Sequence, residues 1–555
     1  MIRLLDVPGG RAAEPLLVGK LLRTPLAVSP AQEIVYRGES RYDYRTLRQR
    51  IGRLASGLAR LGVAEGTTVA VMDWDSHRYL EAYFAVPMMG AVLMTVNLRL
   101  SAAQIRETLD HAQAEVLLVH ADFLELAMRL RGTLPRLGHI VVLEPAAGVD
   151  PAGVAGEYEA LLARETADFP FPEFDENAVA TTFYTTGTTG SPKAVCFSHR
   201  QLVLHTLGVL GALASPQFGQ SVRHGDVYMP LTPMFHVHAW GLPYVATLLG
   251  LKQVYPGRYD ADRILALRRR EQVTYSHCVP TILQMLLSAP SAANTDFSGW
   301  KITVGGSAMS TALARQALDR GIDVFAAYGM SETCPFLLAN RLLQRSGSGS
   351  GDDRPADDEV GNDEVATRCL TGLPLPLVDL RIVDEQMNDV PHDGRTVGEL
   401  VVRAPWLTAG YVGDPAASAQ LWADGYLHTR DIASIDPAGY VQIRDRAKDM
   451  IKSGGEWISS LQLEELIARH PGVAEVAVIA VQDQRWGERP LAVIVPRSGA
   501  GGPPTLDDIT AHLETHVAAG TIPRYALPDR IELVDALPRT SVGKLDKKAL
   551  RAQYR

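Results

Sequence analysis

The sequence predicts an α/β protein: a large N-terminal domain of helix-covered, mostly parallel sheets plus a small β subdomain, followed by a small, mobile α+β C-terminal domain. Three observations support this prediction. Helical periodicity alternates with short apolar, strand-like runs from Leu47 to Tyr328, which is typical of parallel sheets covered on both faces. Between Leu377 and Val402, short strand-like runs are separated by Gly, Asp and Pro. Residues 450–555 alternate again and have the size of an independent domain.

The elements of the large domain follow from hydrophobic spacing. Apolar residues recur at helical spacing over Leu47–Leu61, ahead of a strand-like run at Thr68–Met72. Ser101 and Gln104 have the spacing of a capping box for a helix that reaches about Ala112. The other predicted strands are Ala114–Val119, Ile140–Leu143, Ala178–Phe183, Val273–His277, Ile302–Val304 and Asp323–Ala327, and the other predicted helices are Asp122–Leu134, Ser198–Ala214, Arg263–Arg270 and Thr281–Leu287.

The predicted domains are residues 1–445 and 450–555, joined by a hinge at 446–449. Within the first domain, residues 345–364 consist of Ser-Gly repeats followed by acidic residues, and this composition predicts a mobile surface loop because it cannot build a core. The predicted elements of the second domain are helices at Leu461–Ile467 and Leu506–Val517 and strands at Val473–Val481 and Leu491–Val495.

A loop rich in glycine and threonine, Tyr184–Lys193, follows one predicted strand and precedes the helix expected from Ser198. On such a strand-to-helix turn, backbone N–H groups, hydroxyls and one ammonium can bind a polyphosphate. The loop is not a Walker motif, which needs four residues between its glycines, whereas two separate Gly187 from Gly190. Taken alone, it is also compatible with a flexible surface turn.

Two further loops follow predicted strands. Gly305-Gly306-Ser307 comes after one strand, and Tyr328-Gly-Met-Ser-Glu332 comes after the next. Because loops that follow parallel strands meet at one edge of the sheet, these segments and the glycine–threonine loop are expected to share one crevice.

Composition narrows the class of protein. The chain has 555 residues, 46% hydrophobic and 21% charged, which is typical of a globular protein with a large core. Its net charge of −9 gives no reason to expect nucleic acid as a partner. Met1–Pro15 has no apolar run of a secretory signal, and Tyr83–Val96 is too short to span a bilayer. Four scattered cysteines without CxxC pairing fit a reducing compartment, so we expect a cytoplasmic enzyme.

Five stretches together resemble a known family: Tyr184–Lys193, Tyr328–Glu332, His428–Asp431, Asp445–Trp457 and Pro538–Lys544. They are similar to the adenylate-forming family of acyl-CoA synthetases, luciferases and nonribosomal-peptide adenylation domains. A sixth stretch, Pro233-Met-Phe-His-Val-His-Ala-Trp-Gly-Leu-Pro243, resembles the branch of bacterial medium- and long-chain fatty acyl-CoA synthetases. The resemblance implies that a fatty acid attacks the α-phosphate of ATP, giving an acyl-adenylate and pyrophosphate, and that the thiol of coenzyme A then displaces AMP.

The resemblance also implies roles for individual residues. Thr185 and Glu332 would help to hold Mg²⁺, and Lys544 would bridge the attacking carboxylate and the α-phosphate, where negative charge concentrates. Asp431 would accept hydrogen bonds from both ribose hydroxyls. Trp240 would be a door between the ATP site and an acyl tunnel. The other implied residues are Thr186, Gly187, Thr188, Thr189, Gly190, Lys193, Gly305, Gly306, Ala326, Ala327, Tyr328, Ser331, Arg446, Lys452 and Trp457 for ATP or the adenylate, Lys448 at the hinge, His236 and Val237 for the acyl chain, and Gly454 and Gly455 for coenzyme A.

Several alternatives stay open. Other hydrophobic, aryl or thioether acids, or a carrier protein as the acceptor, are compatible with the same motifs, and relatives are often homodimers. His236 and His238 form an HxH pair, but metal binding would need further ligands nearby. Ala194 and Arg430 stand where relatives usually have glycine, so the sequence is also compatible with a nucleotide-binding protein that has lost catalysis. If position 430 requires a positive φ, Asp431 would be displaced; alternatively, Arg430 would add a phosphate contact.

Overall fold

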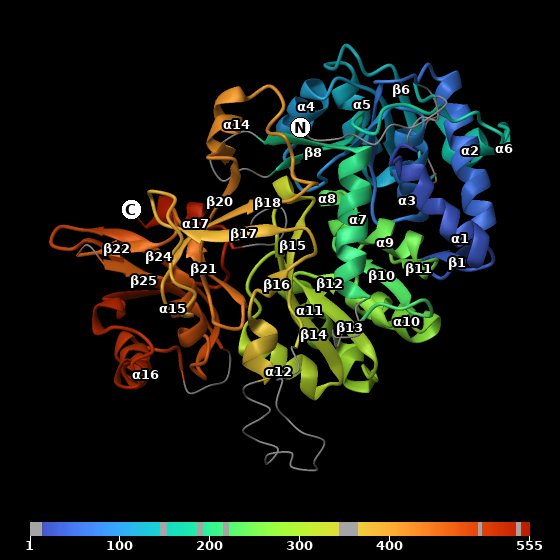
Figure 1. Cartoon of the computed structure of the whole chain (residues 1–555). Helices are drawn as coiled ribbons and strands as arrows, with labels where there is room; N and C mark the ends of the chain where they lie inside the picture. Colours follow the sequence, from blue (N-terminus) through green and yellow to red (C-terminus); the bar gives the residue numbers. More distant parts are fainter. Residues whose placement is uncertain are drawn as a thin grey trace, which may run out of the picture.

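The computed structural model describes residues 14–144, 153–185, 192–214, 221–342, 364–454, 456–497, 502–539 and 545–554. These residues form four β-sheets with helices packed on them (Figure 1). The two largest sheets belong to the part drawn in blue to yellow, and a smaller unit drawn in orange to red lies beside it (Figure 1). The predicted fold class is therefore confirmed.

The first large sheet has seven strands in the order β7-β6-β5-β3-β4-β8-β9. All neighbouring strands are parallel except β8 and β9. Alternate residues of β3 enter two cores: Val69 and Val71 pack in one, and Ala70 and Met72 in the other. Burial on both faces explains why this strand reads as a continuous apolar run. The elements are β3 (Thr68–Met72), β4 (Val92–Thr95), β5 (Ala114–Val119), β6 (His139–Val142), β7 (Gly156–Glu157), β8 (Val179–Thr185) and β9 (Lys193–Ser198), with α2 (Tyr44–Arg60), α3 (His77–Met88), α4 (Ala102–His111), η3 (Ala121–Phe123), α5 (Leu124–Arg131) and α6 (Tyr158–Ala163).

The second large sheet has nine strands in the order β16-β15-β14-β13-β12-β10-β11-β1-β2. One face packs on α10, α11 and α12, and the other belongs to the largest core, which also contains residues of α3, α7 and α9. The elements are η2 (Val18–Leu22), α1 (Arg23–Val28), β1 (Glu33–Tyr36), β2 (Ser40–Asp43), α7 (His199–Leu213), β10 (Val227–Leu231), α8 (Val237–Trp240), α9 (Leu242–Leu248), β11 (Lys252–Tyr255), α10 (Ala261–Glu271), β12 (Tyr275–Cys278), α11 (Pro280–Leu287), η4 (Pro290–Asn294), β13 (Trp300–Val304), α12 (Thr311–Asp319), β14 (Ile322–Gly329), η5 (Ser331–Thr333), β15 (Phe336–Ala339) and β16 (Leu373–Pro374).

Two smaller sheets complete the fold. The first contains β17 (Asp379–Val383), β18 (Gly398–Arg403), β19 (Trp422–Ala423), β20 (Tyr426–Ile435) and β21 (Val441–Arg446), with α14 (Pro415–Leu421) beside it. The second contains β22 (Ile451–Ser453), β23 (Glu456–Ile458), β24 (Val473–Asp483), β25 (Gly487–Pro496) and β26 (Arg530–Leu533), with α15 (Ser460–Ile467), α16 (Leu506–Ala518), η6 (Arg524–Ala526) and α17 (Lys547–Gln553). Residues from Ile451 onward form apolar cores of their own.

Most of the predicted elements agree with the structure, and one prediction is wrong. The loop that starts after Thr185 was expected to lead from a strand into a helix, but it joins the antiparallel strands β8 and β9, and α7 begins only at His199. Lys193-Ala-Val-Cys-Phe-Ser198 extends as a strand because its apolar residues fit a half-buried, pleated edge. Residues 343–363, within which most of the predicted mobile loop falls, lie outside the described residues. In the part of the chain that the structure describes, no helix is long and apolar enough to cross a membrane.

Candidate active site

The glycine–threonine loop joins the ends of two strands. Thr185 ends β8 and stands opposite Lys193, the first residue of β9, whereas Thr186, Gly187, Thr188, Thr189 and Gly190 lie outside the described residues. The ammonium of Lys193 lies 4.7 Å from the ring centroid of Tyr411 and 4.0 Å from Oδ2 of Asp414. Ala194 pairs with Tyr184 and accepts a 3.0 Å hydrogen bond from the N–H of Val412. Its methyl group therefore occupies a strand rather than a turn, and no glycine is needed there.

Glu332 is a buried carboxylate that Tyr411 links to Lys193. It lies in η5 and is only 7% exposed. The hydroxyl of Tyr411 donates a 2.6 Å hydrogen bond to Oε1 of Glu332, and the ring of the same tyrosine lies under the Lys193 ammonium. Burial and the neighbouring Glu332 raise the pKa of Tyr411, so the phenol keeps its proton and remains a donor. Tyr411 thus connects the predicted metal-holding acid to the lysine of the loop, a role that no local pattern in the sequence indicated.

Asp431 is the centre of a second polar group. Its Oδ2 accepts a 2.5 Å hydrogen bond from the hydroxyl of Tyr328, and its Oδ1 lies 3.3 Å from Nε of Arg446. Arg446 stands opposite Asp431 in the β20–β21 pair, and Tyr328 comes from β14 of the large sheet. Asp431 is 3% exposed, and its carboxylate raises the pKa of Arg446. The structure therefore brings together three residues that the sequence analysis assigned to the nucleotide.

Arg430 adopts the backbone conformation that glycine favours. Its φ is 61°, and its carbonyl accepts a 2.9 Å hydrogen bond from the N–H of Ala447. Nη2 donates to the carbonyl of Gln420 at 3.0 Å, and the side chain is 61% exposed. The arginine thus takes a left-handed conformation while Asp431 keeps its bonds to Tyr328 and Arg446, so the expected displacement of Asp431 does not occur.

Small residues allow close packing at the end of β13 and β14. A Cβ on Gly305 would lie 2.9 Å from the carbonyl oxygen of Ala327 and 3.2 Å from the Trp240 ring. Gly306 has a φ of 81°, which also favours glycine. Ala326 and Ala327 are buried, and Ser331 begins η5 in the loop that leads from Tyr328 to Glu332.

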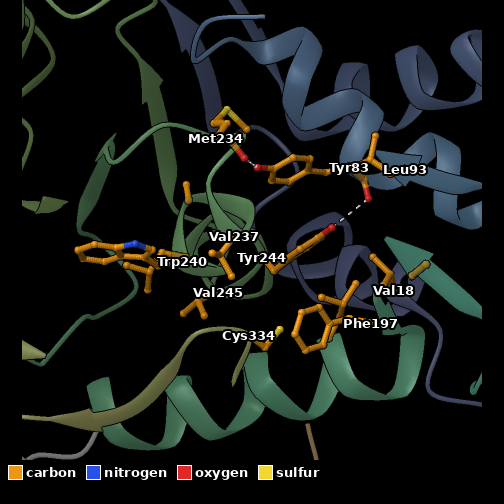
Figure 2. Close-up of a cluster of buried hydrophobic side chains, with 14 of the residues drawn as sticks. Val18, Tyr83, Leu93, Phe197, Met234, Val237, Trp240, Tyr244, Val245 and Cys334 are labelled. Carbon is orange, nitrogen blue, oxygen red and sulfur yellow. Dashed lines mark hydrogen bonds between the residues drawn. The ribbon is translucent and has the colours of Figure 1, made fainter. Parts of the chain in front are cut away.

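The segment before Trp240 is held by β4, α3 and the connection between β3 and α3. The N–H of Met234 donates to Oδ1 of Asp75 at 2.8 Å, and Thr95 Oγ1 donates to the carbonyl of Phe235 at 2.8 Å. The Tyr83 hydroxyl donates to the carbonyl of Met234 (Figure 2). The next residues all have positive φ angles, which are 47° at Val237, 55° at His238, 48° at Ala239, 60° at Trp240 and 74° at Gly241. A left-handed turn of L-residues is costly, and such strain is concentrated at functional sites.

Trp240 lies between the candidate nucleotide residues and an apolar cluster. Its ring contacts His277 at a centroid distance of 5.1 Å and Phe336 at 5.9 Å, and it is 5% exposed. Figure 2 shows Trp240 at one side of a cluster that includes Val237, Tyr244, Val245 and Cys334. Its role as a door stays a prediction. His236, which precedes the turn, is only partly buried.

His238 is fully buried beside Tyr83, Phe183 and Tyr244, and burial lowers its pKa to about 3. The imidazole is therefore neutral at physiological pH. Among the described residues, no group of three or more His, Cys, Asp or Glu side chains could hold a metal ion.

The remaining predicted residues lie at the hinge or on the C-terminal unit. Lys452 is exposed, with its ammonium 5.1 Å from the ring centroid of Trp457, which is 50% exposed. Gly454 has a φ of 61°, and a Cβ there would lie 3.0 Å from the Trp486 ring. Lys448 lies between Arg446 and Ile451, and burial lowers its pKa. Gly455 and Lys544 lie outside the described residues.

Comparison with known proteins identifies the class. The model of the AMP-binding enzyme family matches residues 22–412, and the model of the AMP-binding enzyme C-terminal domain matches residues 462–544. The chain belongs to the family of AMP-binding enzymes, which confirms the predicted class, an adenylate-forming acid–thiol ligase.

Three similar proteins illustrate the range within this family. The chain is 41% identical to a long-chain fatty acid–CoA ligase of Thermus thermophilus, over 100% of this chain and 98% of that protein. It is 37% identical to a 3-methylmercaptopropionyl-CoA ligase of Ruegeria pomeroyi, over 91% and 90%. The crystal structure of the anthranilate CoA ligase AuaEII with anthranoyl-AMP has a TM-score of 0.83 at 24% identity, covering 98% of both chains. Since these relatives act on different acids, the fold and family do not specify the acid.

Proposed function

We propose that the protein activates a medium- or long-chain fatty acid through an acyl-adenylate to its coenzyme A thioester, with release of AMP and pyrophosphate. The position of Trp240 is the observation that carries this proposal. The ring rests against Gly305 on one side and an apolar cluster on the other, so its movement would open a path for an apolar chain toward the nucleotide. The 41% identical long-chain ligase supports the same substrate class.

The described residues fit the chemistry of the first step. A carboxylate oxygen of the acid forms a bond to the α-phosphorus of ATP, the bond to the bridging oxygen breaks, and pyrophosphate leaves. Lys193 and the loop before it would hold the phosphates of ATP. Asp431 would accept hydrogen bonds from the ribose hydroxyls in place of its bonds to Tyr328 and Arg446. Lys544 would bridge the two reacting anions. In the second step, the coenzyme A thiol loses its proton, its sulfur attacks the acyl carbonyl, and AMP leaves.

The residues present fit a magnesium ion bound with ATP. Mg²⁺ is usually held by one or two carboxylates together with substrate phosphates, and Glu332 offers one buried carboxylate, oriented by the hydroxyl of Tyr411. Thr185 would add a hydroxyl from the end of β8. When bound, the ion supplies positive charge to the phosphate oxygens.

We take residues 1–445 as the adenylation domain, 446–449 as the hinge and 450–555 as a domain that turns between the two steps. Rotation would carry Lys544 away and bring Lys452, Trp457, Gly454 and Gly455 toward the site. We also place the reaction in the cytoplasm, and light scattering of the purified protein tests whether it forms a homodimer.

A panel of acids tests the proposal with two assays. Acid-dependent exchange of labelled pyrophosphate into ATP reports adenylation, and chromatography of coenzyme A thioesters reports the complete reaction. We expect both with straight-chain medium or long acids. A strong preference for aryl or thioether acids would overturn the substrate class. Exchange without thioester would indicate a carrier protein as the acceptor, and no exchange despite ATP binding would indicate a nucleotide-binding protein.

A further inference from the structure

A chain of buried polar groups connects the last helix to the strand before the hinge. Lys547, the first residue of α17, donates 2.6 Å and 2.7 Å hydrogen bonds to Ser460 Oγ and Glu464 Oε1. The same Ser460 hydroxyl donates to Oδ2 of Asp445 at 2.5 Å, and the N–H of Ser460 donates to that oxygen at 2.6 Å. The groups thus run from α17 through the start of α15 to β21.

These groups are shielded from water. Asp445, Ser460 and Lys547 are 1%, 0% and 9% exposed, and the side chain of Glu464 is 11% exposed. Glu464 Oε1 also accepts a 2.7 Å hydrogen bond from the N–H of Val478, which ties it to β24. Burial alone would lower the pKa of Lys547, but Glu464 and Asp445 outweigh burial and raise it, so the lysine is charged. Buried charges persist where they are paired and hydrogen-bonded, so this is a specific arrangement rather than a surface contact.

The chain of bonds crosses the proposed hinge. Asp445 precedes residues 446–449, whereas Ser460, Glu464 and Lys547 follow them. If the C-terminal domain turns about Lys448, these groups move away from Asp445, the two hydrogen bonds from Ser460 to Asp445 break, and Lys547 loses the nearby charge of Asp445. Another ion pair of the same helix does not cross this pivot: Arg551 Nη1 lies 2.6 Å from Oδ1 of Asp449, which is on the C-terminal side of Lys448.

We propose that Asp445, Ser460 and Lys547 form a latch that holds the C-terminal domain in the arrangement in which the acyl-adenylate is made. This inference depends on the proposed two-step function. In the latched arrangement the hairpin with Lys452 and Trp457 is exposed, as expected if it acts only after the domain turns. Through Ser460, Lys547 also ties the start of α17 to β21. Lys547 is thus a positioning residue for the C-terminal domain.

The test compares two half-reactions in latch variants and in a matched control. Asp445→Asn and Lys547→Met weaken the latch, Lys547→Arg keeps its charge, and Arg551→Gln breaks an ion pair of the same helix that does not cross the hinge. Loss of a buried charge-assisted bond should lower the rate of acyl-adenylate formation by about 10-fold. The rate of thioester formation from supplied acyl-adenylate should be unchanged or higher. Lys547→Arg should restore part of the first rate, and Arg551→Gln should leave the ratio of the two rates unchanged.

Limited trypsin digestion gives a readout that needs no substrate. Arg446 and Lys448 are exposed in the latched arrangement, but trypsin also needs a mobile backbone, which the latch restrains. Asp445→Asn should therefore be cut at the hinge faster than the parent protein and faster than Arg551→Gln. Equal loss of both half-reactions, or the same change of ratio in Arg551→Gln, would overturn the latch. If the parent protein adenylates no acid, the proposed function fails, and the digestion comparison then decides on the latch alone: equal cutting of the three proteins refutes it.

Discussion

Substitutions of Arg430 test what it costs the protein to carry an arginine where relatives usually have glycine. The residue has a φ of 61°, a conformation that costs residues with a Cβ but not glycine. Its side chain is 61% exposed and bonds the carbonyl of Gln420. Two substitutions separate the effects of the backbone strain and of the side-chain hydrogen bond on stability. Arg430→Ala removes the hydrogen bond and keeps the strain, whereas Arg430→Gly removes both.

The expected difference follows from the backbone. The left-handed conformation costs a residue with a Cβ about 1–2 kcal/mol. Glycine avoids this cost. Its greater conformational freedom in the unfolded chain, however, destabilises the folded state by about 0.5–1 kcal/mol. Because both variants lose the same exposed hydrogen bond, the glycine variant should be more stable than the alanine variant by about 0.5–1 kcal/mol.

Urea unfolding of the two variants, followed by the same optical signal, measures this difference. Pyrophosphate exchange should stay within about twofold of the parent enzyme in both, since the hydroxyl of Tyr328 and Arg446 hold Asp431 without help from the Arg430 side chain. An alanine variant as stable as the glycine variant would refute the strain argument. A rise in exchange of about tenfold or more in Arg430→Gly would show that the arginine costs catalysis.

Four further predictions concern the site and its supports. Burial raises the pKa of Asp75 to about 7, so the folded protein binds this proton more tightly than the unfolded chain does. The free energy of unfolding should therefore fall as the pH rises from about 4 to about 7. Asp75→Asn should flatten this part of the pH profile in urea titrations. Tyr411→Phe removes the hydrogen bond to Glu332 and should raise the Mg²⁺ concentration for half-maximal exchange by about 10-fold, and an unchanged value would contradict that role. Trp240→Ala should change KM and chain-length preference across a panel of acids, and identical kinetics for all lengths would rule out a gate. Lys544→Ala should slow adenylation by at least ~10²-fold and thioester formation much less; equal slowing of both would show a structural role.

The sequence predicted the fold class and many elements because those signals are local. The spacing of Ser101 and Gln104 predicted the start of α4, and the structure shows both halves of the capping box. The apolar run Thr68–Met72 predicted β3 with its observed bounds. The prediction failed after Thr185, where β9 intervenes before the helix, because a short edge strand has a weaker periodic signal than a helix.

The sequence by itself determined the family, the nucleotide motifs and the departures Ala194 and Arg430, since each is written in a short stretch of residues. Only the tertiary structure decided how these residues meet. Tyr328 bonds Asp431 across 103 positions of the chain, Tyr411 bonds Glu332 across 79, and Lys547 bonds Ser460 across 87. Such contacts arise from the packing of separate sheets and domains, and no periodicity or turn chemistry within one segment specifies which distant side chain will complete a buried polar group.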